Sequence, residues 1–486
     1  MSAAALTPAQ QGAFDLLLPV LQGESRHSLA VLEGYAGSGK TYLVAHLLKA
    51  LPASAKVAVA APTNKAVRVL HDQLVAHEVP VAAVGDEDRW DRRPALALTQ
   101  PGCVCRSIHS LLGLRITDTD DGQQEAVEGG ASTLNEYDVV VVDECSMINL
   151  WLFRKIIEGR GHAVILFVGD PAQLPPVEKN GNPTELSPVF TRVQCVMRLT
   201  EIIRQAADNP IIQLSIRIRE WIEFGEKADA KDLMEVLPPL SDLPVAAIVP
   251  GFPKQLVDWW LDQRRDEPDS DVRIIAYTNK RVQMYNAAIH RALHGDTGPL
   301  RFVIGQKVIV QDQCTADRIC DSEAGMYKQD RLITSDELQV LDSQDDPHPF
   351  YPDIPANRLR LRDSRGATYR VWVASDEGAM QRRISACFAR NTQLKAEALK
   401  TPDREYRDDL RQRAKEALAE MRLLKKSFAP LRHAYAITCH KSQGSTFDCA
   451  LVDFSDLKTI KTAFEFNRAL YVAVTRSRTY LAMVIT

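Results

Sequence analysis

The chain of 486 residues is too long for one hydrophobic core, so we expect it to divide into a few domains. With 45% hydrophobic and 25% charged residues it has the composition of an ordinary globular protein. Its formal net charge of -4 argues against a uniformly basic nucleic-acid-binding coat but leaves room for a basic channel.

The cysteines and the start of the chain indicate the cellular compartment. Nine cysteines, an odd number without a C-x-x-C pair, favour reduced thiols in the core of a cytosolic protein over a disulfide or metal framework. The start, MSAAALTPAQQ, lacks a basic region and a long apolar stretch, and no run elsewhere is long enough to span a bilayer. We therefore expect a soluble cytoplasmic protein with no membrane partner.

Short apolar runs alternate with helical patterns along the chain. The early runs are Leu29 to Leu32, Val57 to Ala61, Val139 to Val142 and Ala163 to Val168. A second series consists of Val272 to Tyr277, Ala434 to Thr438, Cys449 to Phe454 and Tyr480 to Ile485. Such alternation predicts parallel sheets covered by helices. The sequence therefore predicts an α/β fold with two domains of this kind.

Two segments interrupt the alternation. RITDTDDGQQEAVEGG, residues 115–130, predicts an exposed acidic hairpin around the turn dipeptide Asp121-Gly122. Residues 302–430 contain FVIGQKVIVQD and RLRLRDSRGATYRVWV, which are β-like with glycine turns, and predict a small β-barrel. The charged stretch Leu394 to Lys426 favours a solvated helix or helical pair with i,i+4 ion pairs over a direct grip on nucleic acid.

A glycine-rich stretch directly follows the first apolar run. GYAGSGKT, Gly34 to Thr41, fits the P-loop pattern G-x-x-x-x-G-K-[ST] between a predicted strand and a predicted helix. Its backbone N–H groups and the helix N-terminus favour phosphate, Lys40 would reach the β and γ phosphates, and Thr41 would ligate Mg²⁺. The predicted nucleotide-binding residues of this loop are Gly37, Ser38, Gly39, Lys40 and Thr41.

Two carboxylates follow the third apolar run. Asp143 and Glu144 come directly after Val139 to Val142, at the carboxyl end of a buried strand, where ligand sites of such sheets gather. Asp143 would hold Mg²⁺, and Glu144 would orient and deprotonate an attacking water. The pair favours ATP hydrolysis over phosphate transfer to a metabolite.

The order of further motifs resembles superfamily 1 helicases, in particular the superfamily 1B group of Dda-type phage helicases and RecD-like proteins. LTPAQQ resembles the Q motif, which implies that Gln10 contacts the adenine edge. GDPAQLPPV, Gly169 to Val177, resembles motif III and implies that Gln173 senses the γ-phosphate or its water.

The resemblance also implies two arginines that face the nucleotide from the second domain. LTEIIRQ, Leu199 to Gln205, resembles motif IV and offers Arg204, and ALYVAVTRSR, Ala469 to Arg478, resembles motif VI and offers Arg476. Guanidinium groups stabilise charge on a transferring phosphoryl group, so domain closure would complete the site.

Nucleic-acid contacts are implied by three more motifs. APTNKAVRVL resembles motif Ia, SIHSLLG resembles motif Ib and TCHKSQGSTFD resembles motif V, which would couple the strand to the nucleotide through Gly444. Hydroxyls, amides and lysine suit phosphate positioning. The implied contact residues are Pro62, Thr63, Asn64, His109, Thr438, His440, Lys441 and Gln443.

The resemblance gives each predicted part a place in the architecture. Residues 1–114 with 135–195 would form RecA-like domain 1A, and residues 196–301 with 431–486 would form RecA-like domain 2A. Residues 115–134 would be the pin that splits the duplex, and residues 302–430 an SH3-like barrel with a helical arm. Between Leu114 and Glu136 the sequence has no Phe, Tyr or Trp, so strand separation would rest on steric exclusion.

The implied function is that of an ATP- and Mg²⁺-dependent DNA helicase moving 5′-to-3′ on single-stranded DNA, because GDPAQLPPV has the RecD/Dda form of motif III. It would act as a monomer at single-strand/duplex forks in a bacterial or phage-infected cell, beside single-strand-binding, replication, repair or recombination proteins. The alternatives are a single-strand translocase that displaces proteins with little unwinding, a RecD-like motor subunit of a larger complex, and a regulatory nucleotide switch without nucleic acid.

Overall fold

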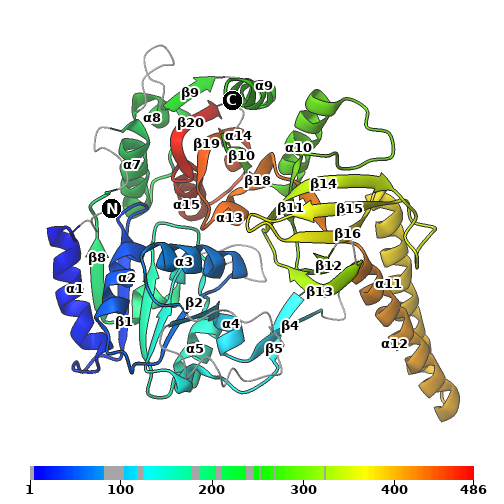
Figure 1. Ribbon diagram of the computed structural model, residues 1–486, viewed down its shortest axis with the longest axis horizontal. Coiled ribbons are helices and arrows are strands. Elements are labelled where there is room, and N and C mark those ends of the chain that lie inside the picture. The colour runs from blue at the N-terminus through cyan, green and yellow to red at the C-terminus, as the bar shows by residue number, and fades with distance from the viewer. Residues whose placement is uncertain are drawn as a thin grey trace. The chain divides into compact units, whose positions relative to one another are not determined.

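The computed structural model describes residues 5–81, 103–118, 124–176, 185–203, 209–236, 246–250, 253–267, 270–321 and 325–485. The chain divides into two compact units. Unit 1 comprises Met1–Val282 and Ile437–Thr486, and unit 2 comprises Gln283–Ala436. Unit 1 contains two parallel sheets, and unit 2 contains an antiparallel sheet with a long helical hairpin (Figure 1).

The first sheet of unit 1 is parallel, with strand order β3-β2-β6-β7-β1-β8. Its strands are β1 (Leu29–Gly34), β2 (Val57–Ala61), β3 (Cys103–Ser107), β6 (Val139–Val142), β7 (Val164–Gly169) and β8 (Cys195–Leu199). The four predicted apolar runs are its four central strands, because strands covered on both faces must be apolar throughout. The two edge strands β3 and β8 are mixed in character and were not predicted.

The predicted domain boundary after residue 195 is wrong. Strand β8 pairs with β1 from Ala30↔Cys195 to Gly34↔Leu199, so the first domain continues to Leu199. Edge strands tolerate polar residues, and Arg198 on β8 forms an ion pair with Glu33 on β1 at 2.9 Å. A charged, half-exposed strand of this kind gives no continuous apolar run to detect.

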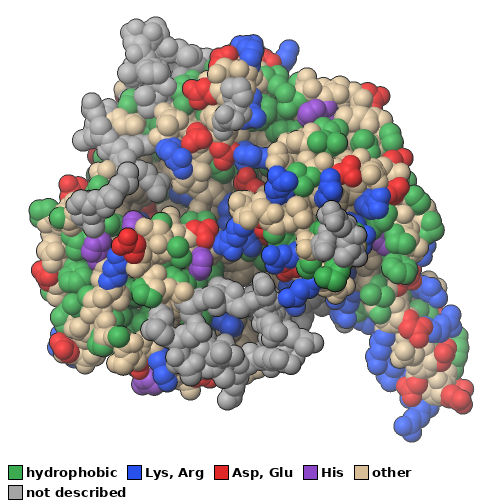
Figure 2. Space-filling model, viewed as in Figure 1, with side chains coloured by type: hydrophobic (Ala, Val, Ile, Leu, Met, Phe, Trp, Pro, Cys, Tyr) green, Lys and Arg blue, Asp and Glu red, His purple; other side chains and the backbone are tan. Residues whose placement is uncertain are grey.

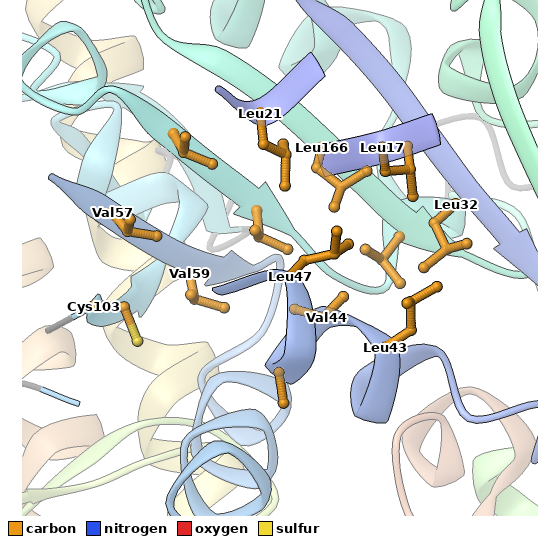
Figure 3. Packing of buried hydrophobic residues seen from close by; sticks show 14 of the residues in the cluster. Leu17, Leu21, Leu32, Leu43, Val44, Leu47, Val57, Val59, Cys103 and Leu166 are labelled. Carbon is orange, nitrogen blue, oxygen red and sulfur yellow. The ribbon is translucent and has the colours of Figure 1, made fainter. Parts of the chain in front are cut away.

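Helices cover both faces of the first sheet. They are α1 (Pro8–Leu21), α2 (Lys40–Ala50), α3 (Asn64–Ala76), α4 (Ile108–Leu111), α5 (Leu150–Gly159) and α6 (Pro188–Arg192). Figure 3 shows one core, in which Leu43 and Leu47 of α2 meet Leu17 of α1 and the strand residues Leu32 and Leu166. Each side chain buried in this way contributes roughly 1.5–3 kcal/mol, so the core fixes the strand ends that carry the site.

A hairpin extends from the first domain. Strands β4 (Leu114–Asp118) and β5 (Gln124–Glu128) pair antiparallel, with Leu114 opposite Glu128. The predicted turn residues Asp121 and Gly122 lie outside the described residues. Glu128 on β5 forms an ion pair with Lys155 on α5, which ties the base of the hairpin to the domain.

The second sheet of unit 1 has the order β18-β10-β19-β20-β9. Its strands are β9 (Ala246–Pro250), β10 (Val272–Ala276), β18 (Ala436–Thr438), β19 (Phe447–Asp453) and β20 (Ser477–Ile485). The helices of this domain are α7 (Pro210–Phe224), α8 (Ala230–Val236), α9 (Lys254–Asp266), α13 (Cys439–Ser442), α14 (Phe454–Leu457) and α15 (Ala463–Val474), and the boundary with unit 2 falls within α10 (Asn279–His294). Helix α15 is buried from Glu465 to its end and packs against α7.

Unit 2 is built on an antiparallel sheet with the order β13-β12-β16-β15-β14-β11-β17. Its strands are β11 (Lys307–Val310), β12 (Cys314–Asp321), β13 (Met326–Leu332), β14 (Glu337–Asp345), β15 (Ala356–Arg362), β16 (Thr368–Ala374) and β17 (Leu431–His433). Inward-facing Val308, Leu338 and Val371 share one core with Phe302. Unit 2 extends beyond the predicted insertion of residues 302–430 at both ends.

The charged stretch of unit 2 is a helical hairpin of α11 (Glu377–Lys400) and α12 (Arg404–Ser427). Leu394 and Leu410 belong to the small apolar core of the hairpin. Acidic and basic side chains alternate over its surface (Figure 2), and Arg413 pairs with Asp409 at i,i+4. The first helix starts well before Leu394 because the Asp376 side chain caps it by accepting from Ala379 N.

All nine cysteines are free, as predicted. Seven are buried, Cys195 is half-buried and Cys320 on β12 is exposed. Within the described ranges no helix combines the length and the apolar character that crossing a bilayer requires.

Candidate functional site

The predicted P-loop connects β1 to α2 with two left-handed glycines. Gly37 has a φ of 80° and Gly39, the N-cap of α2, a φ of 78°. The left-handed backbone of Gly39 favours glycine, and a Cβ there would lie 2.4 Å from Gln10 Nε2, so the end of the Gln10 side chain would have to shift. Lys40 Nζ donates to the carbonyls of Gly34 at 2.8 Å and Tyr35 at 2.9 Å, and burial lowers its pKa.

The two predicted carboxylates lie at the carboxyl end of β6. Asp143 Oδ1 accepts from Glu144 N at 2.8 Å, and burial raises the Asp143 pKa. Glu144 adopts left-handed backbone, φ 51° and ψ 40°, which is rare for a residue with a Cβ and occurs at functional sites. Burial, and then the Asp143 charge, raise the pKa of Glu144 to about 7. Glu144 therefore titrates in the range that suits a general base.

These groups share one cleft of about 490 Å³ between the two parallel-sheet domains. The first domain contributes Lys40, Thr41, Asp143, Glu144 and Gln173, and the second contributes Gly444, Ser445, Thr446, Thr475 and Arg476. A Cβ at Gly444 would lie 3.7 Å from Glu144 Oε1, so the two domains approach closely beside the carboxylate. The cleft thus brings most of the predicted nucleotide residues together.

Arg476 reaches this cleft from the end of α15. It is 6% exposed, and its guanidinium donates to the carbonyls of Val472 and Ser445, each at 3.1 Å. Its charge lowers the pKa of Glu144, which opposes the effect of burial. Arg204, the other predicted arginine, lies outside the described residues.

Three buried polar atoms around the cleft have no hydrogen-bond partner among the described residues: Ser38 Oγ, Gln173 Oε1 and Ser445 Oγ. Buried polar atoms are normally paired, so atoms of this kind indicate a site for a polar ligand. Described His, Cys, Asp and Glu side chains form no group of three that could hold a metal. Thr41 and Asp143 both line the cleft, and a hydroxyl and a carboxylate supply the oxygen atoms that Mg²⁺ prefers as ligands.

Gln10 lies where α1 meets the P-loop and is 2% exposed. Its Nε2 donates to Ser38 O at 3.4 Å, and its Oε1 accepts from Thr7 N at 3.1 Å. Gln10 lines the same cleft as Tyr42 and His77, whose rings meet edge to face at 5.2 Å. This end of the cleft offers ring and amide groups, as a nucleobase requires.

A second polar cluster between the two domains was not predicted. Asp170, directly after β7, pairs with Arg219 of α7 and accepts from the Tyr471 hydroxyl at 2.8 Å. The same hydroxyl accepts from Ala36 N of the P-loop at 3.2 Å. The Arg219 guanidinium stacks over the Tyr35 ring at 3.8 Å, and the three central side chains are at most 9% exposed. This Asp170 network joins both domains to the P-loop.

One pattern in the sequence could have identified Arg219. On a helix, Ile211, Ser215 and Arg219 are spaced by four residues and share one face with Ile218, and all four are buried. An arginine on an otherwise buried face needs an acidic partner, so the pattern could have marked Arg219 as one half of a buried ion pair without identifying Asp170.

The residues predicted from motifs Ia and Ib lie together. Thr63 caps α3 by accepting from Ala66 N at 3.2 Å, and Asn64 is the first residue of that helix. The His109 imidazole donates to the backbone carbonyl of Pro62, and burial lowers the pKa of His109. The structure therefore brings Pro62 and His109 together through a direct contact.

The residues predicted from motif V surround the short helix α13. Thr438 caps it by accepting from Lys441 N at 3.3 Å. His440 packs against the Tyr277 ring at 5.7 Å, and burial lowers its pKa. Gln443 Nε2 donates to the Leu174 carbonyl of the first domain at 3.5 Å. This contact links motif V to motif III across the domains.

Two parallel-sheet domains that share a P-loop cleft define a P-loop NTPase with tandem RecA-like domains. Residues 6–230 match the family model of an AAA domain, and residues 433–484 match that of a UvrD-like helicase C-terminal domain. Over 318 residues the chain is 25% identical to the ATP-dependent DNA helicase Dda of Enterobacteria phage T4, covering 63% of this chain and 61% of Dda. Over 159 residues it is 35% identical to the RecD subunit of RecBCD from Mycolicibacterium smegmatis, covering 31% of this chain and 26% of RecD.

The chain thus spans less than two thirds of the length of these curated relatives. Among solved structures, a Bacteroides Pif1 helicase crystallised with ADP-AlF3 and single-stranded DNA is similar, with a TM-score of 0.52 and 17% identity over 100% of this chain and 94% of that one. That likeness concerns the fold. Separate parts of the chain are thus similar to an AAA domain, to a UvrD-like helicase C-terminal domain and to the Dda and RecD proteins.

Proposed function

We propose that this protein is an ATP-dependent DNA helicase that moves 5′-to-3′ along single-stranded DNA and separates the duplex ahead of it. The observation that carries the proposal is the cleft in which Lys40 and Glu144 of one RecA-like domain face Arg476 of the other. Such a cleft makes hydrolysis depend on the approach of two domains, which is what a motor requires. The similarity to Dda supports DNA as the track.

The residues divide the hydrolytic chemistry among themselves. Lys40 and the P-loop N–H groups bind the phosphates, and Glu144 orients the attacking water and takes its proton. Thr41 and Asp143 hold Mg²⁺, which supplies charge neutralisation when bound. Gln173 senses the γ-phosphate or its water: its Nε2 can donate to a phosphate oxygen, and its Oε1, which has no partner among the described residues, can accept from the water. Arg476 and Arg204 stabilise the charge that develops on the transferred group.

Single-stranded DNA is held by the residues of motifs Ia, Ib and V. Its phosphates contact Thr63, Asn64 and His109 on the first domain and Thr438, His440 and Lys441 on the second, with little reading of base identity. Gln443, a proposed DNA contact, donates to the carbonyl of Leu174, which directly follows Gln173. The DNA-binding residues are therefore linked to the residue that senses the γ-phosphate. The protein acts as a monomer at forks, beside single-strand-binding or replication and recombination proteins.

A translocase that displaces proteins with little unwinding is the second candidate. The segment between Leu114 and Glu136, which holds the β4–β5 hairpin, has no aromatic residue to stack on the terminal base pair. Base stacking on an aromatic ring contributes about 1–3 kcal/mol, so its absence weakens an unwinding pin without affecting translocation.

Strand separation on two matched duplexes, one with a 5′ tail and one with a 3′ tail, tests the proposal. We expect ATP-dependent opening of the 5′-tailed duplex alone, and loss of opening in Lys40→Ala and Glu144→Gln. Lys49→Ala is the matched control, because Lys49 lies on the same helix but does not line the cleft.

Opening of the 3′-tailed duplex alone would show that the protein moves 3′-to-5′, opposite to the proposed direction. If neither duplex opens while single-stranded DNA still stimulates hydrolysis, the translocase replaces the helicase. In a nucleotide switch, single-stranded DNA would not stimulate ATP hydrolysis. The rate would also show no salt-dependent effect of DNA, because there are no phosphate contacts to release counterions.

A further inference from the structure

A short loop of residues 443–446 joins helix α13 to strand β19, and it contains a hydroxyl group that the predicted site does not use. Ser445 lines the nucleotide cleft and is 8% exposed. Its Oγ atom has no hydrogen-bond partner among the described residues. A buried hydroxyl without a protein partner costs free energy, and it therefore indicates a ligand that supplies the partner.

The main chain of Ser445 is paired on both sides. Its N–H donates to the Ser442 carbonyl at 3.0 Å, and its carbonyl accepts from Arg476 Nη1 at 3.1 Å. The Phe447 N–H donates to the Arg476 carbonyl at 2.8 Å, so Arg476 holds this loop at two points. The backbone of Ser445 is thus fixed, and its side-chain hydroxyl is the group left open to a ligand.

The loop places this hydroxyl beside the hydrolytic groups. Gly444, directly before Ser445, has a left-handed φ of 70°, and a Cβ on it would lie 3.7 Å from Glu144 Oε1. The carbonyl of Ser445 itself binds Arg476, which faces the transferring phosphoryl group. The hydroxyl therefore belongs to the end of the cleft where Glu144 and Arg476 act, and not to the nucleobase end near Gln10.

We propose that Ser445 is a further catalytic residue, whose hydroxyl donates a hydrogen bond to an oxygen of the γ-phosphate. This proposal rests on the proposed ATP-driven function and adds a phosphate-binding group of the second domain to the P-loop of the first. A serine hydroxyl can donate, and a charged acceptor such as a phosphate oxygen makes the hydrogen bond strong. ADP lacks the γ-phosphate, so the hydroxyl distinguishes ATP from ADP and draws the two domains together only while ATP is bound.

The test compares the binding of ADP and of the non-hydrolysable ATP analogue AMP-PNP, both with Mg²⁺, to the full-length protein by isothermal titration calorimetry. Ser445→Ala should raise the Kd of AMP-PNP roughly 10- to 100-fold and leave the Kd of ADP unchanged, because a hydrogen bond to a charged group is lost only where the γ-phosphate is present. The kcat/KM for ATP should fall by at least the same factor. Ser445→Thr retains the hydroxyl and should keep the preference for AMP-PNP.

Thermal unfolding without nucleotide separates this role from a structural one. Ser445→Ala removes a buried hydroxyl that has no partner in the described part of the chain, so its Tm should equal or exceed that of the wild type. Ser215→Ala is the matched control, because Ser215 on α7 is 5% exposed, does not line the cleft and donates from Oγ to the Ile212 carbonyl at 2.8 Å. This control should lower the Tm and leave both nucleotide Kd values unchanged.

Three outcomes would contradict the expected result. Equal losses of AMP-PNP and ADP affinity in Ser445→Ala would overturn the proposal, because the hydroxyl would then meet a part that both nucleotides share. Unchanged affinities for both nucleotides would overturn it as well, and the helicase proposal would still stand on the opening of the 5′-tailed duplex. A wild-type protein that hydrolyses no ATP and opens neither duplex would overturn both proposals.

Discussion

The nucleotide cleft and the Asp170 network lie between the same two RecA-like domains, but their polar groups are in opposite states. Around the cleft, Ser38 Oγ and Gln173 Oε1 are buried and have no hydrogen-bond partner in the part of the chain that the structure describes. In the network, the Asp170 carboxylate is fully buried and accepts from both Arg219 and Tyr471. A cluster in which every polar group has a hydrogen-bond partner holds its side chains in place. A cluster with unpaired polar atoms is suited to binding a ligand.

This difference indicates how the two domains can move. The P-loop touches both clusters, because Lys40 lines the cleft and Ala36 N donates to Tyr471. We therefore expect the Asp170 network to remain joined while the cleft around Glu144 and Arg476 opens and closes. The following experiments separate these two roles, from the largest expected effect to the smallest.

Removing the arginine of the cleft should have the largest effect. Arg476→Ala should lower DNA-stimulated hydrolysis by about 10³-fold or more, because an arginine that stabilises the transferring phosphoryl group contributes 10³–10⁵ in kcat. Steady-state ATPase rates and the Kd of a nucleotide analogue measure this. The Kd should change far less than kcat, and an equal loss in both would mean that Arg476 only binds ground-state nucleotide.

Breaking the Asp170 network should act on stability. Arg219→Met leaves the buried Asp170 carboxylate without its cation and should cost about 3–5 kcal/mol of unfolding free energy. Urea unfolding measures it. Adding Asp170→Asn should restore much of the loss, because the unpaired charge is removed. Additive losses in the double variant would show that the two side chains act independently.

The Tyr471 hydroxyl tests the link between network and P-loop. Tyr471→Phe removes one donor to Asp170 and the acceptor of Ala36 N and Arg219 Nε, and should cost about 1–3 kcal/mol because the buried Arg219 N–H loses a partner. The KM for ATP should rise, since the P-loop loses support. Arg217→Ala, on an exposed ion pair of the same interface helix α7, should leave KM unchanged.

The pH dependence of hydrolysis should give the smallest effect. Glu144 acts as a base only when deprotonated, and its pKa is raised to about 7. Activity is therefore full well above pH 7 and is lost as pH falls, by about fivefold between pH 7 and pH 6. Rate profiles from pH 5.5 to 8.5 measure this. The residual rate of Glu144→Gln should not change around pH 7. If the fall in rate around pH 7 remains in this variant, a group other than Glu144 causes it.

The sequence predicted those elements of the structure that depend on residues close together in the chain. Val139 to Val142 is a strand because it is apolar on both faces, and the P-loop is recognisable because glycine is required at Gly37 and Gly39. The mixed edge strand Cys195–Leu199 was missed, because an edge strand is stabilised by its neighbour and shows no periodicity of its own.

Side-chain contacts between residues far apart in the sequence could not be predicted from the sequence pattern. Arg219 finds Asp170 49 residues away and Tyr471 252 residues away, and no spacing rule connects them. His290 and His433 likewise stack on each other although they lie near opposite ends of the continuous stretch that forms unit 2. Sequence motifs identify residues that bind a common ligand. Contacts between side chains that are distant in the sequence are seen only in the tertiary structure.

The distribution of thiols has a practical consequence for spectroscopy. Cys320 is exposed on β12, Cys195 is half-buried and the other seven cysteines are buried. A maleimide dye should therefore react first at Cys320, and a Cys195→Ser background would make the labelling selective. The fluorophore would sit on unit 2, and its quenching by labelled oligonucleotides would report binding in single molecules without altering the nucleotide cleft.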